Sequence, residues 1–264
     1  MKAYDFEYSG RTLSEFGMII CNFGSKGLDT ISNGSEVTFN TISVLGGSKH
    51  ELTSVEYEDC LETTIQICKN PCSGNDMEIS SSTFRELTKW LSRKKFLKFK
   101  PLSEEYIDLY YEAKINVSRI ELDDRLVGLE LEILTNRPFA LKELKTITIK
   151  NLVQNGKHSL NDASHEEGYI YPYTEITIIE GGDLNIYNAI EDRNTYIANC
   201  VAGEVITMDY PIIQSSVSSH NIQNDFNWNF FRVANTYEYS RNDLTISIPC
   251  TIKIKYSPIV KVGL

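Results

Sequence analysis

The chain has few positive charges for its size. It contains 26 Lys and Arg against 36 Asp and Glu in 264 residues, a formal net charge of −10. Residues 1–140 carry −6 of this charge and residues 141–264 carry −4. Binding to duplex nucleic acid depends on Lys and Arg that neutralise phosphates. Because neither half has that charge, we expect no specific DNA binding.

Long apolar runs are also missing. No stretch of 18 apolar residues occurs, so the sequence predicts no membrane-spanning helix. The first seven residues include Asp5 and Glu7, which the apolar region of a secretory signal peptide does not tolerate. We therefore expect a protein that is made in the cytosol and does not enter a membrane.

Cysteine and histidine are too few and too scattered to build a metal site. The six Cys make up about 2% of the chain, which has no export signal, so we expect free thiols. Cys68 and Cys72 form the one close pair, and a zinc site needs a second such pair. The four His are far apart: His50, His158, His165 and His220. The sequence predicts no metal and no cofactor.

Catalytic signatures are absent as well. The chain has no Gly-x-Ser-x-Gly elbow, no phosphate-binding Gly-rich loop and no His-Glu-x-x-His helix. Three adjacent acid pairs occur, at 104–105, 123–124 and 166–167. Neighbouring residues on a strand face opposite sides, so such a pair does not converge on one bond, and we interpret these acids as solvated turn residues. We expect no enzyme.

What the sequence does contain is period-2 alternation, which is typical of half-buried strands. It runs through residues 37–41, 65–67, 115–120, 126–134, 147–152, 176–179, 205–208 and 244–254. Asn-Gly and Gly-Gly pairs at 33–34, 46–47, 155–156 and 181–182 mark turns. The predicted fold class is mainly β.

One segment has helical spacing instead. Phe84, Leu87, Trp90 and Leu91 lie on one face of a helix predicted over about residues 82–94, and we expect all four to anchor the core. Thr83 or a neighbouring Ser caps its start, and Thr83 with Glu86 fits a capping box. The cations at 93–95 match the negative end of the helix dipole.

A domain boundary is predicted near Arg137-Pro138, because proline there removes a donor from the strand ladder. Residues 1–140 then form a first β domain with the single helix. Residues 141–264 contain no convincing helix, and a two-sheet β-sandwich is the simplest architecture for them.

The densest aromatic cluster covers residues 226–232 (FNWNFFR). A sugar-binding face uses an exposed Trp beside Asn and Arg, so a carbohydrate-binding sandwich is one interpretation. The spacing of two between Phe226, Trp228 and Phe230 favours the inward face of a strand. We therefore expect Trp228 to be a core anchor.

Several motifs, in this order and spacing, resemble those of the distal tail proteins (Dit) of long-tailed phages and prophages of Gram-positive hosts. They are residues 6–17 (FEYSGRTLSEFG), 85–91 (RELTKWL), 136–140 (NRPFA), 171–173 (YPY), 202–209 (AGEVITMD), 226–230 (FNWNF) and 252–258 (IKIKYSP). The resemblance covers most of the chain.

The resemblance implies an N-terminal β-barrel-like domain with one helix and a C-terminal galectin-like β-sandwich. It also implies a hexameric ring at the distal end of the tail, assembled in the host cytoplasm, that joins the tail tube to the tail tip or baseplate. DNA would pass through without specific binding, so we expect a neutral or acidic channel with residues 93–100 facing away. Residues 220–223 (HNIQ) lack the Pro and Arg of the galectin sugar motif, so that motif is not carried over.

A ring needs an interface between copies, and an edge strand over residues 37–45 is our candidate. The interface residues predicted there are Val37, Phe39, Thr41 and Val44. The rival interpretation is a carbohydrate-binding module or a component of a tail-associated wall hydrolase, with Glu166 and Glu167 as the acids nearest a His.

Overall fold

The computed structural model describes residues 3–24, 37–43, 50–57, 60–73, 77–236 and 238–263. The chain forms two compact units. The first comprises Met1–Leu141 with Lys261–Leu264, and the second comprises Lys142–Val260. The last four residues thus belong to the first unit, whereas the sequence placed them in the second. Tyr111 explains this return, because its hydroxyl donates a hydrogen bond to the carbonyl of Gly263 at 2.7 Å.

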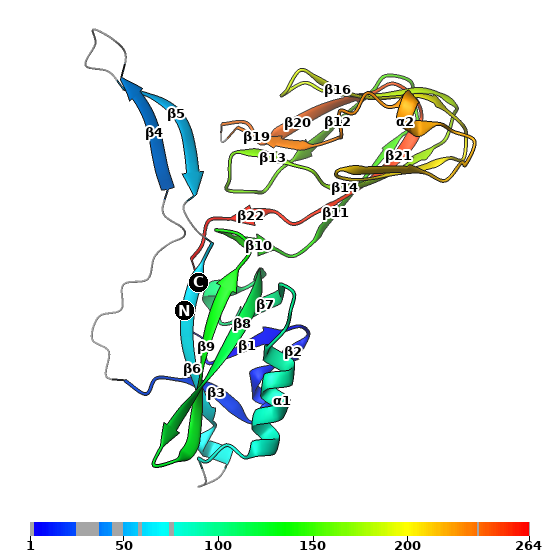
Figure 1. Cartoon of the computed structure of the whole chain (residues 1–264). Coiled ribbons are helices and arrows are strands. Elements are labelled where there is room, and N and C mark those ends of the chain that lie inside the picture. The colour runs from blue at the N-terminus through cyan, green and yellow to red at the C-terminus, as the bar shows by residue number, and fades with distance from the viewer. Residues whose placement is uncertain are drawn as a thin grey trace. The chain divides into compact units, whose positions relative to one another are not determined.

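The main sheet of the first unit is antiparallel, with strands in the order β2-β1-β7-β8-β9-β6-β3 (Figure 1). Their bounds are β1 Asp5–Tyr8, β2 Arg11–Thr12, β3 Met18–Cys21, β6 Glu62–Lys69, β7 Leu97–Leu102, β8 Leu109–Leu122 and β9 Arg125–Thr135. Short 3-10 turns cover Leu13–Phe16, Pro71–Ser73 and Glu104–Tyr106. The amide of Ile20 in β3 donates to the carbonyl of Tyr4, beside β1, at 3.1 Å. This bond brings the two ends of the sheet together, as in a barrel.

A separate two-stranded ribbon consists of β4 (Val37–Ser43) and β5 (His50–Tyr57). Two further short strands, β10 (Ala140–Lys142) and β22 (Ile259–Val260), lie where the chain leaves the first unit and returns to it. Strand β9 ends at Thr135, just before Arg137-Pro138.

Helix α1 spans Ser81–Leu91 and lies alongside β8 (Figure 1). Its cap is Ser80, whose hydroxyl accepts from the amide of Thr83 at 3.2 Å. The Thr83–Glu86 capping box was therefore wrong, because Thr83 already lies inside the first turn. The helix also ends earlier than predicted. Arg93 follows it and donates from Nε to the carbonyl of Trp90 at 3.1 Å, so a cation still meets the free carbonyls of the last turn.

The helix face differs from the prediction at one position. Leu87, Trp90 and Leu91 are buried. Phe84 is only half-buried, and the guanidinium of Arg119 covers its ring at 4.4 Å from the ring centre, so Phe84 is not a core anchor. Phe84 lies in the first turn of the helix, where it meets the exposed end of β8 rather than the core.

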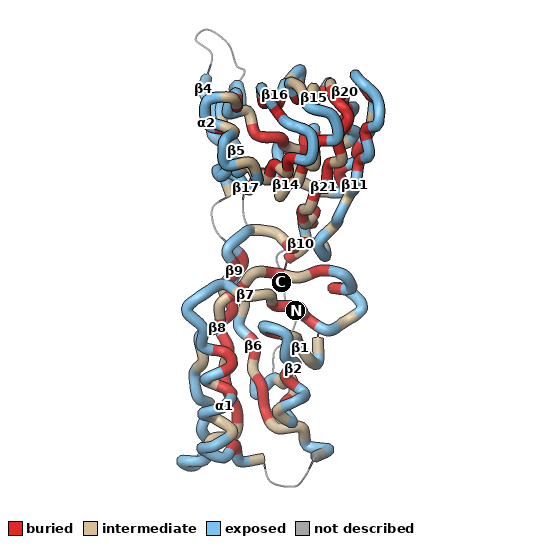
Figure 2. Tube along the Cα trace, turned by 90° about the vertical axis from the view of Figure 1, so that its right-hand side faces the viewer, coloured by how far each residue is buried: buried red, intermediate tan, exposed pale blue. Residues whose placement is uncertain are grey.

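The second unit is a sandwich of two antiparallel sheets. One has the order β11-β21-β14-β17-β18 and the other β12-β20-β15-β16. Their bounds are β11 Lys145–Asn151, β12 Gly156–Asn161, β14 Tyr173–Ile178, β15 Gly182–Asn188, β16 Arg193–Cys200, β17 Val205–Asp209, β18 Ile212–Ser215, β20 Arg241–Ile246 and β21 Cys250–Tyr256. Strands β13 (Gly168–Ile170) and β19 (Val233–Asn235) form a small extra pair. The core consists of the alternate residues that point between the two sheets, and Figure 2 shows these buried positions along the strands.

The predicted mainly β fold is confirmed, with two local differences in this unit. The segment 244–254 forms two strands in different sheets, β20 and β21, because the chain turns at Ser247–Pro249. A one-turn helix, α2 (Ile222–Asp225), lies where no helix was expected.

Trp228 is the clearest error of the sequence analysis. It is 56% exposed, whereas Phe226 and Phe230 on either side are buried. Residues 227–232 form a loop and not a strand, so the spacing of two has no inward face to follow. The backbone of Trp228 is left-handed, with φ of 59°. Trp228 is therefore a surface residue and not a core anchor.

Candidate functional site

The β4–β5 ribbon has one mainly apolar face and one mainly polar face, and the exposed Ile42 lies on the polar one. Val37 lies opposite Tyr57, and Phe39 lies opposite Val55, so these four side chains share a face. On the other face the amide of Asn40 donates to the hydroxyl of Ser54 at 2.9 Å. Alternation along each strand produces this division, as the sequence pattern predicted for residues 37–41.

The apolar face of the ribbon is exposed. Phe39 is 65% exposed and Val55 48% exposed, and beyond a bulge at Asn40/Thr41, Leu52 is 56% exposed opposite Thr41. Within the described part of the chain, β4 and β5 pair as strands only with each other (Figure 1). Of the predicted interface residues, Val37, Phe39 and Thr41 lie on this ribbon, and Val44 lies outside the described residues.

A second candidate surface is the polar face of the main sheet. Register places Glu132 of β9 beside Asn116 of β8, and Glu130 of β9 beside Gln66 of β6. The amide of Asn116 donates to Glu132 at 2.8 Å, and the amide of Gln66 donates to Glu130 at 3.1 Å. Neutral amides do not compensate the charge of a carboxylate. Lys114 of β8 lies on the same face, opposite Leu134, but the carboxylates of Glu62, Glu130 and Glu132 outnumber it and leave this face acidic. We call the face formed by Glu62, Gln66, Asn116, Glu130 and Glu132 the acidic sheet face.

The basic segment 93–100 does not lie wholly away from this face. Register pairs Lys98 of β7 with Glu112 of β8, on the same side of the sheet as the even-numbered residues of β8. The ammonium of Lys98 lies 4.7 Å from the ring centre of Tyr110. Lys98 thus borders the acidic sheet face.

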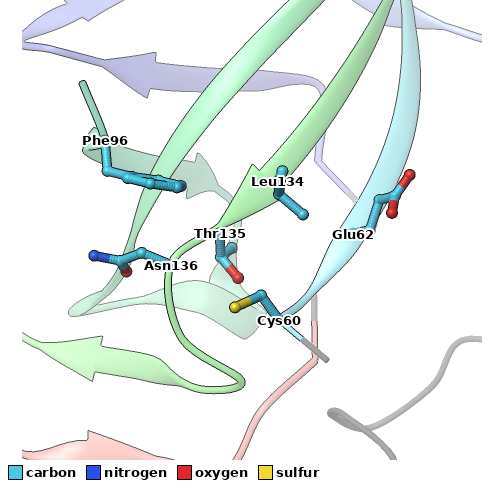
Figure 3. A pocket seen from close by; sticks show the side chains of 6 residues that line it. All are labelled: Cys60, Glu62, Phe96, Leu134, Thr135 and Asn136. Carbon is cyan, nitrogen blue, oxygen red and sulfur yellow. The ribbon is translucent and has the colours of Figure 1, made fainter. Parts of the chain in front are cut away.

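A pocket of about 660 Å³ lies at one end of the main sheet (Figure 3). Two of its polar side chains are hydrogen-bonded within the fold. The hydroxyl of Thr135 accepts from the amide of Leu61 at 2.9 Å, and the amide of Asn136 donates to Glu112 at 2.7 Å. Figure 3 shows the carboxylate of Glu62 directed away from Cys60. Among the described residues that line the pocket, no base lies beside the thiol. Its lining residues are Cys60, Glu62, Phe96, Leu134, Thr135 and Asn136.

The adjacent acids lie in turns or loops, as interpreted. Asp123 and Asp124 form the two-residue turn between β8 and β9, with φ of 48° and 63°, as a type I′ hairpin turn requires. Residues 104–105 lie in a 3-10 turn and 166–167 in the loop before β13. His158 is in β12, where its Nε2 lies 3.0 Å from the amide oxygen of Asn151.

No group of three or more metal-ligating side chains occurs among the residues that the structure describes. All six cysteines fall within that part and are free thiols. Burial raises the pKa of Cys21 to about 12 and that of Cys200 to about 11, so both remain protonated and unreactive. In the same ranges, no helix has the length and apolar character needed to cross a membrane.

One buried polar cluster had no signal in the sequence. Glu204, Ser215 and His220 meet in the second unit, with the Ser215 hydroxyl donating to Glu204 Oε1 at 2.5 Å and His220 Nδ1 at 2.5 Å from the same oxygen. In a catalytic serine site the hydroxyl would face the imidazole. Here both groups face the carboxylate, which makes the cluster a structural one.

The chain is mainly β, with a barrel-like first unit and a sandwich as its second unit. Two family models match it: residues 1–137 match the phage tail protein N-terminal domain, and residues 139–256 match the phage tail C-terminal domain. The chain therefore belongs to this family of phage tail proteins.

The fold is that of a distal tail protein. A crystal structure of the Dit protein (gp 19.1) of phage SPP1, described as a paradigm of the hub adsorption apparatus in phages that infect Gram-positive bacteria, is similar with a TM-score of 0.62. The sequences are 10% identical, and the similarity covers 97% of this chain and 99% of that chain. A search of curated proteins finds no match.

Proposed function

We propose that the protein is a noncatalytic hub whose copies close into a hexameric ring between the tail tube and the tail tip or baseplate. The observation that carries this proposal is the exposed apolar face of the β4–β5 ribbon. An isolated two-stranded ribbon is only marginally stable in water. A ribbon with Phe39, Leu52 and Val55 exposed on one face gains stability when another surface covers that face.

The partner in this proposal is a second copy of the same chain. A cyclic ring needs two different complementary patches on every copy, because each copy contacts its two neighbours through different surfaces. The ribbon supplies one of these patches through its exposed apolar face, and a strand of the neighbouring copy could add backbone hydrogen bonds at its edge. The similarity to a hub protein supports the same assignment.

Light scattering and negative-stain images of the full chain test this proposal. We expect the parent to form a ring with a central hole and Phe39→Asp to remain monomeric. Asn40→Asp is the matched control, because it adds the same charge on the polar face of the same strand and should assemble like the parent. Circular dichroism would verify that both variants fold. A parent that is monomeric at every concentration, or a Phe39→Asp variant that forms normal rings, would contradict the proposal.

The acidic sheet face is our proposed lining of the channel. Carboxylates repel the phosphate backbone and let DNA slide, whereas each Lys or Arg on a phosphate adds salt-dependent affinity. Glu130 and Glu132, which pair only with neutral amides in the contacts described above, are the central residues of this lining.

A tail-associated wall hydrolase is the rival function. Glu166 and Glu167 are consecutive loop residues, and His165 beside them is exposed. We expect purified protein to release no product from cell walls. Hydrolysis that disappears in Glu166→Gln or Glu167→Gln would establish the rival function instead.

A further inference from the structure

Four exposed aromatic side chains of the second unit are linked to one another by contacts. Tyr169, Tyr210 and Trp228 are each 56% exposed and Tyr171 is 37% exposed. They come from β13, the loop that follows it, the β17–β18 turn and the loop after α2. We call these four residues the aromatic strip.

Direct contacts join the members of the strip. The rings of Tyr171 and Tyr210 stack with centres 4.3 Å apart, and Tyr210 meets the buried ring of Phe230 edge-on at 5.3 Å. Phe230 in turn contacts Trp228 at 6.5 Å. At the other end, the guanidinium of Arg232 lies 3.5 Å from the ring centre of Tyr169. The four residues are thus one connected set, joined directly or through Phe230 and Arg232, and not scattered aromatics.

The loop that carries Trp228 is held in place. The side-chain oxygen of Asn227 accepts from the amides of Tyr196 and Asn229 at 3.2 and 3.1 Å, and its amide donates to the carbonyl of Asn194 at 3.0 Å. A left-handed backbone is unfavourable for a residue as bulky as Trp. The hydrogen bonds of Asn227 hold Trp228 in this conformation with its ring in solvent, so the ring is organised before any ligand arrives.

The strip carries no net charge. Arg232, its one cation, is 18% exposed and pairs with Glu191, whose side chain is 5% exposed, at 2.5 Å. The guanidinium also donates to the hydroxyl of Tyr171 at 3.3 Å. An anionic polymer gains little from a cation that is already neutralised, so the charge balance favours a neutral ligand.

The exposed area of the strip is better suited to a sugar chain than to a protein partner. An aromatic side chain buries about 150–250 Å² when fully covered, so four half-exposed rings offer roughly 400 Å². A standard protein interface takes about 800 Å² per partner. Tyr and Trp rings are apolar on the face and hydrogen-bond at the tip, and sugars offer both C–H faces and hydroxyl groups, so the chemistry of the strip suits a polysaccharide.

We propose that the aromatic strip of Tyr169, Tyr171, Tyr210 and Trp228 binds a neutral polysaccharide. This inference is independent of ring formation, since every residue involved lies in the second unit of a single copy. Binding should occur with the monomeric Phe39→Asp variant as well as with the parent.

Tryptophan fluorescence of the full chain provides the test. The chain has two Trp, and Trp90 is 3% exposed, so acrylamide quenching reports mainly on Trp228. We would titrate short neutral oligosaccharides of glucose, galactose, N-acetylglucosamine and rhamnose, with polyglycerol phosphate as the anionic comparison. A neutral oligosaccharide should shift the emission to the blue and protect Trp228 from quenching.

Variants locate the site by calorimetry. Trp228→Ala and Tyr210→Ala should each weaken binding by about ten-fold or more. Tyr239→Ala is the control, because Tyr239 is a 65% exposed tyrosine of the same unit with no ring contact to the strip among the contacts described. Absence of binding to every neutral oligosaccharide, preference for the anionic polymer, or undiminished binding by Trp228→Ala and Tyr210→Ala would each overturn the inference.

Discussion

The imidazole of His220 lies against the carboxylate of Glu204, with Nδ1 2.5 Å from Oε1 and the two side chains 3% and 0% exposed. The other carboxylate oxygen accepts from the amide of Val201 at 2.9 Å. On the far side of the ring, Asp225 Oδ2 is 3.3 Å from Nε2. Glu204 precedes β17 and Asp225 ends α2, so the cluster ties that short helix to the sandwich.

Replacing Glu204 should destabilise the second unit. Glu204→Gln keeps the shape of the side chain but removes the charge that strengthens its hydrogen bonds, and we expect a loss of about 1.5–3 kcal/mol in the free energy of unfolding. Glu175→Gln is the control, because Glu175 pairs with Lys253 on the surface and should cost no more than about 1 kcal/mol. Urea unfolding, followed for each variant, measures both values. Equal losses would show that the buried cluster contributes no more than a surface pair.

The same carboxyl predicts a dependence on pH. Burial acts to raise the pKa of Glu204, but hydrogen bonds from Ser215, His220 and Val201 together lower it below its ordinary value of 4.5. A carboxyl with a lower pKa in the folded state stabilises the fold above its unfolded pKa, and this stabilisation is lost as the pH falls through the folded pKa. We expect the Tm of the parent to fall more steeply than that of Glu204→Gln below about pH 4.5. Parallel Tm curves for the two proteins would contradict this.

The two tryptophans should respond oppositely to truncation. Trp90 stacks on Phe6 and Phe16, with ring centres 5.7 and 4.7 Å apart, and its Nε1 donates to the carbonyl of Tyr8 at 2.8 Å. Trp90→Ala should cost about 3–5 kcal/mol in the free energy of unfolding. Trp228→Ala should change it by about 0.5 kcal/mol or less, the range of an exposed position. Thermal unfolding of both variants checks this, and a loss below about 0.5 kcal/mol for Trp90→Ala would place Trp90 outside the core.

These two residues also show what the sequence could and could not predict. The burial of Trp90 was predictable, because helical spacing with Leu87 and Leu91 defines a face through bonds within one segment. Trp228 had strand spacing, but Asn227 bonds to the backbone at Asn194 and Tyr196, some thirty residues earlier. Residue spacing within a segment does not indicate a partner so far away in the sequence, so the loop was predicted to be a strand.

Pairing across distance also limits the prediction of the candidate sites. Alternation predicted a strand at residues 37–41, but it does not indicate that β4 and β5 pair with each other and with none of the described strands of the main sheet. The Glu204–His220 pair joins residues 16 positions apart with no shared motif. In both cases the sequence identified the residue types but did not indicate which of them lie close together in the fold.

The final prediction concerns DNA. If the acidic sheet face lines a channel, assembled rings should not bind DNA even at low salt, because carboxylates repel phosphates and no counterions are released. Replacing Glu130 and Glu132 together with Lys should create binding that weakens steeply as salt rises. The control is Glu180→Lys with Asp209→Lys, which adds the same charge at exposed positions of the second unit. A fluorescence titration with labelled duplex measures all three proteins.

Two outcomes would contradict the channel assignment. One is tight binding by the parent that is lost when Lys94, Lys95 and Lys98 become Ser, since this would place the basic segment in the path of the DNA. The other is equal binding by the two double variants, since charge alone would then explain the gain. Lys98 makes the first outcome a demanding test, because it borders the acidic sheet face through its pairing with Glu112. A parent that ignores DNA despite this lysine would show that the carboxylates dominate the local potential, as Coulomb repulsion over a Debye length of about 8–10 Å predicts.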